Sequence, residues 1–246
     1  MNRSRTHKEE IKVDTYSENN SVKLGGVVAS DLEFSHEIYG EKFYKFFIEI
    51  DRLSGQKDKL PVIISERLVD LNELHMGKML VVNGQYRSYN QMLESGKSKL
   101  ILSIFVKEVQ TEDLPDNVRM LNDVKLIGCI CKPPIYRKTP LGRDIADALI
   151  AVNRTYNKSD YIPCILWGRN AKFCQTLGIG TNVKLEGRIQ AREYEKKFED
   201  GTKETRVAYE VSVAKFEEFK STVSKDTDAQ TTDVENSESV ENVVEE

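Results

Sequence analysis

The chain has 246 residues, 39% hydrophobic and 31% charged, which suffices for two domains with buried cores. No run of about 18 apolar residues occurs and no apolar stretch follows the N-terminus, so we expect neither a membrane span nor a secretory signal, and a cytoplasmic protein. The net charge of −4 is uneven: residues 21–121 carry −2, residues 122–219 carry +4 and residues 220–246 carry −6.

The chain contains an internal repeat with a shift of 102 residues. Residues 22–26 match residues 124–128, and after one inserted residue, 84–87 match 187–190. A period of this length is too long for a solenoid repeat, so it indicates two copies of a whole domain.

Hydrophobic alternation predicts a similar order of elements in both copies. In the first copy we expect a helix near 68–74 and strands near 22–30, 42–51, 60–65, 78–88 and 99–109. In the second copy we expect a helix over 168–177 and strands at 124–131, 143–154, 161–167, 183–194 and 205–216. Five strands with one short helix between the third and fourth is the order of an OB-fold, so the predicted class is mostly β, with two tandem OB-folds.

Composition divides the chain further. The first 20 residues and residues 220–246 are too polar to offset the entropy of ordering, so both are predicted to be disordered. The predicted organisation is a disordered segment 1–20, a first OB-fold domain 21–111, a linker 112–121, a second, basic OB-fold domain 122–219, and an acidic tail 220–246.

The four cysteines, Cys129, Cys131, Cys164 and Cys174, all lie in the second copy. A zinc site is one interpretation, but paired Cys-x2-Cys motifs are missing and the three histidines lie in the first half. Reduced cysteines that pack as small hydrophobic residues are the alternative, and we expect no metal and no cofactor.

Cations and rings alternate along the second copy. Arg188, Gln190, Arg192 and Tyr194 are spaced by two on one predicted strand and would form one outward-facing row. Unpaired DNA offers phosphates to cations and base faces to flat rings, so this row is typical of a surface for single strands. Each ring taken singly is equally compatible with packing in the core.

Residues 122–128, 139–143, 151–156, 165–171 and 183–194 resemble the bacterial single-stranded DNA-binding protein family. The resemblance extends over 122–219 and is fainter over the first copy. It implies stacking rings at Tyr156, Tyr161, Trp167 and Tyr194. The full set of predicted DNA-binding residues is Arg143, Arg154, Tyr156, Tyr161, Trp167, Arg169, Arg188, Gln190, Arg192 and Tyr194, with Arg52, Arg87 and Tyr89 in the first copy.

The resemblance also implies sequence-independent protection of single-stranded DNA in replication, recombination or repair, association with the nucleoid, and a homodimer that presents four OB-folds. Two departures stand out. Tails of this family usually end in an acidic tip with an aromatic residue that docks replication or repair proteins, whereas this acidic tail ends without a ring. In the first copy, Ile64 is expected where Trp167 stands in the second.

The sequence contains no phosphate-binding glycine loop and no cluster of carboxylates with a base or nucleophile, so an enzyme is not expected. The alternative function is a replication or recombination accessory protein that uses OB surfaces mainly to hold other proteins.

Overall fold

The computed structural model describes residues 19–93, 96–198 and 201–218. The predictions for residues 1–18 and for the acidic tail lie outside these residues. The first half contains β1 (Asn20–Val28), β2 (Glu33–Ile38), β3 (Glu41–Asp51), β4 (Lys57–Ser65), β5 (Met79–Met92) and β6 (Ser98–Gln110), and the 3-10 turns η1 (Leu71–Glu73) and η2 (Val118–Met120). The second half contains β7 (Asn122–Ile130), β8 (Ile135–Lys138), β9 (Asp144–Asn153), β10 (Ser159–Trp167), α1 (Arg169–Cys174), β11 (Asn182–Lys197) and β12 (Lys203–Glu218).

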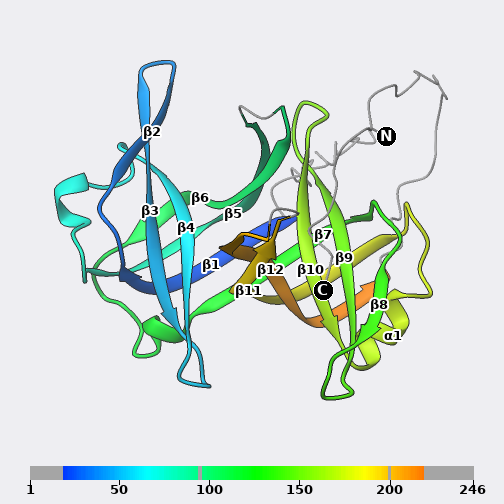
Figure 1. The fold of residues 1–246 in the computed structure, drawn as a ribbon. Helices are drawn as coiled ribbons and strands as arrows, with labels where there is room; N and C mark the ends of the chain where they lie inside the picture. The colour runs from blue at the N-terminus through cyan, green and yellow to red at the C-terminus, as the bar shows by residue number, and fades with distance from the viewer. Residues whose placement is uncertain (1–18, 94–95, 199–200, 219–246) are drawn as a thin grey trace, which may run out of the picture.

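Each half closes into a five-stranded barrel, and the two barrels lie side by side (Figure 1). The first barrel has the order β1-β3-β4-β6-β5-β1, and the second has the order β7-β9-β10-β12-β11-β7. In both barrels one pairing is parallel, between β4 and β6 and between β10 and β12, and the others are antiparallel. The predicted fold class is therefore confirmed.

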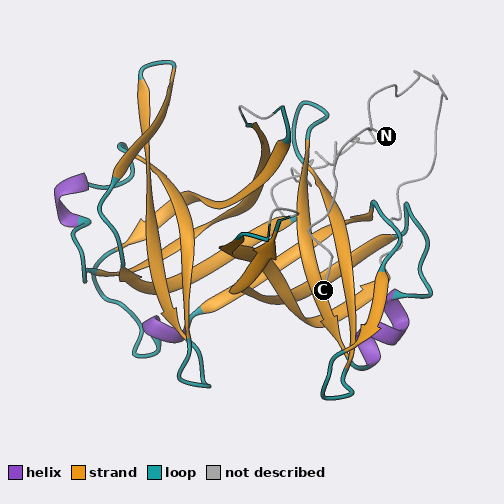
Figure 2. Ribbon diagram, in the orientation of Figure 1, coloured by secondary structure: helices purple, strands orange, loops and turns teal. Residues whose placement is uncertain are grey.

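One predicted element differs in kind from the structure, and two short strands of the structure were not predicted. The first helix is a single 3-10 turn, η1, capped by the Asp70 side chain, which accepts from the Asn72 N–H. Strands β2 and β8 were not predicted, because both are short and largely exposed and form only by pairing with β3 and β9. Figure 2 shows how little helix the described residues contain.

Each barrel has a glycine at the strand pair that completes the ring. Gly26 on β1 and Gly128 on β7 stand at equivalent positions, 102 residues apart. A Cβ atom at either residue would collide with a backbone oxygen, that of Glu49 on β3 or that of Ala151 on β9. The missing side chain therefore permits the β1–β3 and β7–β9 pairings that complete the two rings.

The barrels join through their first strands. β1 and β7 pair antiparallel, with Val22 opposite Val124, its equivalent in the repeat. The pairing therefore has a pseudo-two-fold axis, like a self-complementary dimer contact made within one chain. The buried apolar residues of both halves form one continuous core, so the two barrels are packed against each other.

Candidate nucleic-acid interface

The outer side of β10 carries two exposed rings. Tyr161 is 42% exposed and Trp167 is 38% exposed, whereas the residues that alternate with them point into the barrel and are buried. Residues at alternate strand positions face the same way, so both rings lie on one face of the sheet. The Trp167 indole Nε1–H donates a hydrogen bond of 3.2 Å to Ser212 Oγ on the neighbouring strand β12, which orients this ring against the sheet.

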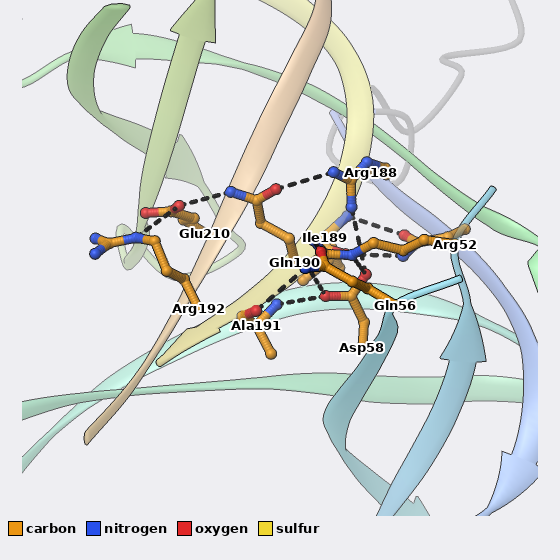
Figure 3. Close-up of polar contacts among 10 residues, drawn as sticks. Arg52, Gln56, Asp58, Arg188, Ile189, Gln190, Ala191, Arg192 and Glu210 are labelled. Carbon is orange, nitrogen blue, oxygen red and sulfur yellow. Dashed lines mark hydrogen bonds and ion pairs between the residues drawn. The ribbon is translucent and has the colours of Figure 1, made fainter. Parts of the chain in front are cut away.

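The predicted row on β11 is present, but its centre is buried. Gln190 is only 7% exposed, which contradicts the expectation that the whole row faces solvent. Its Nε2 donates to Glu210 Oε1 at 2.7 Å, and its Oε1 accepts from Arg188 at 3.1 Å. Arg192 donates to the same Glu210 oxygen at 3.4 Å, and its guanidinium lies 5.8 Å from the centre of the Tyr194 ring. Figure 3 shows the contacts that link Arg188, Gln190, Glu210 and Arg192.

Glu210 is the residue of this face that sequence reasoning missed. It lies on β12 directly opposite Gln190 and is 7% exposed. Pairing the predicted strands 183–194 and 205–216 as a hairpin would have located this acid inside the cationic row. Its carboxylate offsets part of the positive charge of Arg188 and Arg192, and it also holds their strand in place through Gln190.

Tyr156 lies in the hairpin that joins β9 and β10 and is 92% exposed. Its φ angle is 61°, and that of the next residue, Asn157, is 54°. Two successive positive φ angles are what a type I′ hairpin turn requires, although residues other than glycine rarely adopt them. The turn therefore presents the Tyr156 ring to solvent, away from the barrel core.

Two predicted cations are unpaired in the part of the chain that the structure describes. Arg143 precedes β9 and Arg169 begins α1, and both are exposed. Neither guanidinium has a hydrogen-bond or ion-pair partner among the described residues. Both are thus available to a phosphate without breaking an existing contact.

Four other predicted arginines lie at the boundary between the barrels and are engaged there. They form ion pairs with two buried aspartates, Arg52 and Arg188 with Asp58, and Arg87 and Arg154 with Asp160. Burial raises the pKa of Asp160, and the hydrogen bond from the Ser88 N–H and the charges of the two arginines partly oppose this rise. Burial also lowers the pKa of Arg87 and of Arg188. Sequence reasoning identified these arginines but not their acidic partners.

The first barrel presents a different surface. Ile63 pairs with Phe105 as Ile165 pairs with Ser212, so the counterpart of Trp167 is Ser65. The expectation that Ile64 takes this position was off by one residue, because Ile64 points into the core and is fully buried.

The predicted first-barrel residues behave differently from one another. Tyr89 on β5 is 52% exposed. Arg87 is half-buried, with its guanidinium 5.7 Å from the centre of the Phe105 ring. Phe105 in turn packs against the buried Phe43, with 5.6 Å between ring centres. Tyr89 is therefore the predicted residue of this barrel that remains available for stacking.

The cysteines lie in and around the core of the second barrel. Cys164 and Cys174 are buried in it, and Cys129 and Cys131 are half-buried. Within residues 19–93, 96–198 and 201–218, no three histidine, cysteine or acidic side chains are grouped as metal ligands. No described helix is long and apolar enough to cross a membrane.

Comparison with known proteins gives consistent results. Residues 121–219 match the model of the single-strand binding protein family. Single-stranded DNA-binding protein B of Bacillus subtilis is 37% identical over 86 residues, which cover 31% of this chain and 74% of that protein. Single-stranded DNA-binding protein 1 of Staphylococcus aureus is 39% identical over 83 residues, and the chain spans half the length of that relative.

The solved structure of the wild-type single-stranded DNA binding protein from Thermus aquaticus matches both barrels. The TM-score is 0.63 at 19% identity, over 85% of this chain and 96% of the other. At this identity the likeness concerns the fold. The family and these relatives are described by binding and not by a reaction, which agrees with the expectation that the chain is not an enzyme.

Proposed function

The chain belongs to the single-strand binding protein family, and from this premise we propose that it binds single-stranded DNA without sequence preference, on the outer face of its second barrel. Bases stack on Tyr156, Tyr161 and Trp167, and the backbone runs past the exposed cations Arg143, Arg169 and Arg192. In this role the protein covers unpaired strands during replication, recombination or repair in the bacterial cytoplasm.

One observation carries the proposal: Tyr161 and Trp167 share one solvent-facing side of β10. A soluble domain gains stability by burying such rings, so leaving two of them on one face suits a partner that stacks on them. Each stacked base contributes about 1–3 kcal/mol, and this contribution is independent of sequence because every base has a flat face. Arg192, which lies over Tyr194, adds a cation beside a ring.

The test is a titration with a short single strand and the matching duplex at two salt concentrations. Trp167 is the only tryptophan, so stacking on it should quench the intrinsic tryptophan fluorescence. We expect quenching by the single strand and little by the duplex. The affinity for the single strand should fall as salt rises, because bound phosphates release counterions. Equal binding of both forms, or binding without quenching, would reject the proposed face.

The proposal extends to the oligomeric state and to protein partners. A homodimer would present four barrels to one strand, and sedimentation at several protein concentrations tests for it. The acidic tail, 220–246, lies beyond the described residues, and recruitment of replication or repair proteins through it is tested by pull-down with and without that segment. If the protein binds such partners but no DNA, the accessory role replaces the proposed one.

A further inference from the structure

Two fully buried carboxylates connect the barrels. Asp58 on β4 and Asp160 on β10 are both 0% exposed and stand 102 residues apart, the shift of the internal repeat. Each accepts a hydrogen bond from a backbone N–H of the opposite barrel. Asp58 Oδ1 accepts from Ala191 at 2.8 Å, and Asp160 Oδ1 accepts from Ser88 at 2.7 Å. The two contacts are therefore reciprocal.

The first carboxylate is bracketed by arginines from both barrels. Arg52 of the first barrel donates through Nε to Asp58 Oδ2 at 2.6 Å, and Arg188 of the second barrel lies 3.3 Å from the same oxygen. Arg52 also reaches the Ala191 carbonyl at 3.3 Å. Figure 3 shows this group, in which β11 contacts β4. Asp58 thus binds backbone and side chain of the neighbouring barrel at once.

The second carboxylate has the same arrangement with the barrels exchanged. Arg154 of the second barrel lies 3.2 Å from Asp160, and Arg87 of the first barrel lies 3.9 Å from it. The Tyr161 N–H adds a hydrogen bond of 2.7 Å to Ser88 Oγ, again between barrels. At 3.9 Å Arg87 makes an ion pair with Asp160 but no hydrogen bond, so the Ser88 N–H and Arg154 supply the hydrogen bonds that this carboxylate accepts.

We propose that Asp58 and Asp160 are positioning residues that act as two reciprocal clasps. They fix the angle between the barrels, so that one DNA strand can run across both outer faces. The β1–β7 ladder joins the barrels along one line, and a clasp on each side of its pseudo-two-fold axis prevents rotation about that line. The clasped strands β5 and β11 carry Tyr89 and Arg192. The clasps therefore set the distance between the outer face of the first barrel, at Tyr89, and that of the second barrel, at Arg192. The inference rests on the proposed function.

The clasps also assign a role to the four boundary arginines. A buried carboxylate held between two arginines keeps their guanidinium groups directed toward it and away from phosphate. In this proposal Arg52, Arg87, Arg154 and Arg188 orient the barrels, and the exposed cations contact the strand.

The first experiment needs no DNA. Amide hydrogen exchange is measured by NMR on the full chain, for the wild type, Asp58→Ala, Asp160→Ala and the control Asp147→Ala. Asp147 on β9 pairs with Arg137 on β8, both in the second half of the chain, so its loss breaks an ion pair that does not cross the boundary between the barrels. We expect Asp58→Ala to speed exchange of the Ala191 amide at least about tenfold, and Asp160→Ala to do the same for Ser88. The control leaves both amides protected.

The second experiment compares strand lengths. An oligo-dT of about 10 nucleotides fits one barrel, and one of about 30 needs both. For the double variant Asp58→Ala/Asp160→Ala we expect binding of the short strand within about twofold of wild type and of the long strand weakened about tenfold, because the second contact loses its geometric advantage. Asp58→Asn/Asp160→Asn keeps one acceptor oxygen at each position, for the backbone N–H of Ala191 or Ser88, and should restore part of the long-strand affinity; it also serves if the alanine variant does not fold.

Three outcomes overturn the clasps: unchanged exchange of both amides, equal loss of affinity for both strand lengths, or tighter binding of both lengths by the arginines that the substitutions release. Wild-type protein that binds neither strand defeats the proposed function. The exchange measurement still decides whether the two carboxylates hold the barrels together.

Discussion

The two barrels share their scaffold and differ on their outer faces. Both close at an equivalent glycine, and in both an asparagine at the start of the first strand clamps a neighbouring backbone. Asn20 exchanges two hydrogen bonds with Tyr86, and Asn122 exchanges two with Ile189. These contacts depend on backbone geometry, which the two halves have in common.

The outer faces follow a different rule. In the first barrel, Ser65 takes the position that Trp167 has in the second. Ser103 corresponds to Glu210, since Ser103 pairs with Arg87 as Glu210 pairs with Gln190. The first barrel has its extra ring at Phe105, where Phe43 and Arg87 cover it. The net charges are −2 and +4. The interior of the repeat therefore specifies the fold, while the outer side chains decide which barrel offers free rings to a ligand.

The largest expected effect tests the shared scaffold. Gly26→Ala and Gly128→Ala should each lower the free energy of unfolding by about 2–3 kcal/mol, because the added Cβ meets a backbone oxygen that cannot move without opening the barrel. Thermal or urea unfolding measures this. Gly178→Ala is the matched control, since nothing lies within 4 Å of its added Cβ. A large effect at only one of the two glycines would break the equivalence of the barrels.

The next effect tests the difference between the faces. Trp167→Ala should weaken binding of single-stranded DNA by about 2 kcal/mol, the contribution of one lost stacking platform. Tyr89→Ala, the exposed ring of the first barrel, should cost less, because its face is less cationic. Fluorescence anisotropy with labelled oligo-dT measures both variants, and circular dichroism checks their folding. Equal losses would show that both barrels contribute alike.

The smallest effect concerns the acid within the cationic row. Glu210→Gln keeps an acceptor oxygen for Gln190 and removes a negative charge beside Arg188 and Arg192. Affinity for single-stranded DNA should rise about threefold to fivefold at low salt, equivalent to less than about 1 kcal/mol, and the gain should shrink as salt screens it. Glu49→Gln, which breaks a surface ion pair of the first barrel, is the charge-matched control. Weaker binding by Glu210→Gln would mean that this acid mainly holds β11 in place.

Much of the fold was predictable, because strand alternation and the repeat can both be read directly from the linear sequence. β2 and β8 owe their existence to partner strands, which the linear pattern does not reveal. The first helix is a single 3-10 turn, η1, although residues 66–78 between β4 and β5 form a segment almost as long as residues 168–181 between β10 and β11. At the site, Tyr156, Tyr161 and Trp167 are exposed, which the sequence pattern left open, whereas burial of Gln190 depends on Glu210, which comes from another strand.

Alternation and charge can be read along the chain, so the sequence predicts two barrels of similar strand order, a basic second half and the strand positions of the rings. Which cations are free depends on the folded chain. Arg52 and Arg154 meet the buried aspartates of their own barrels across a hairpin. Arg87 and Arg188 reach the aspartates of the opposite barrel, because pairing of β1 with β7 brings β4 and β10 against β11 and β5. A side chain's periodicity specifies its face of a strand, but the acidic partners of Arg87 and Arg188 come from segments about 70–130 residues away, and only folding brings them together.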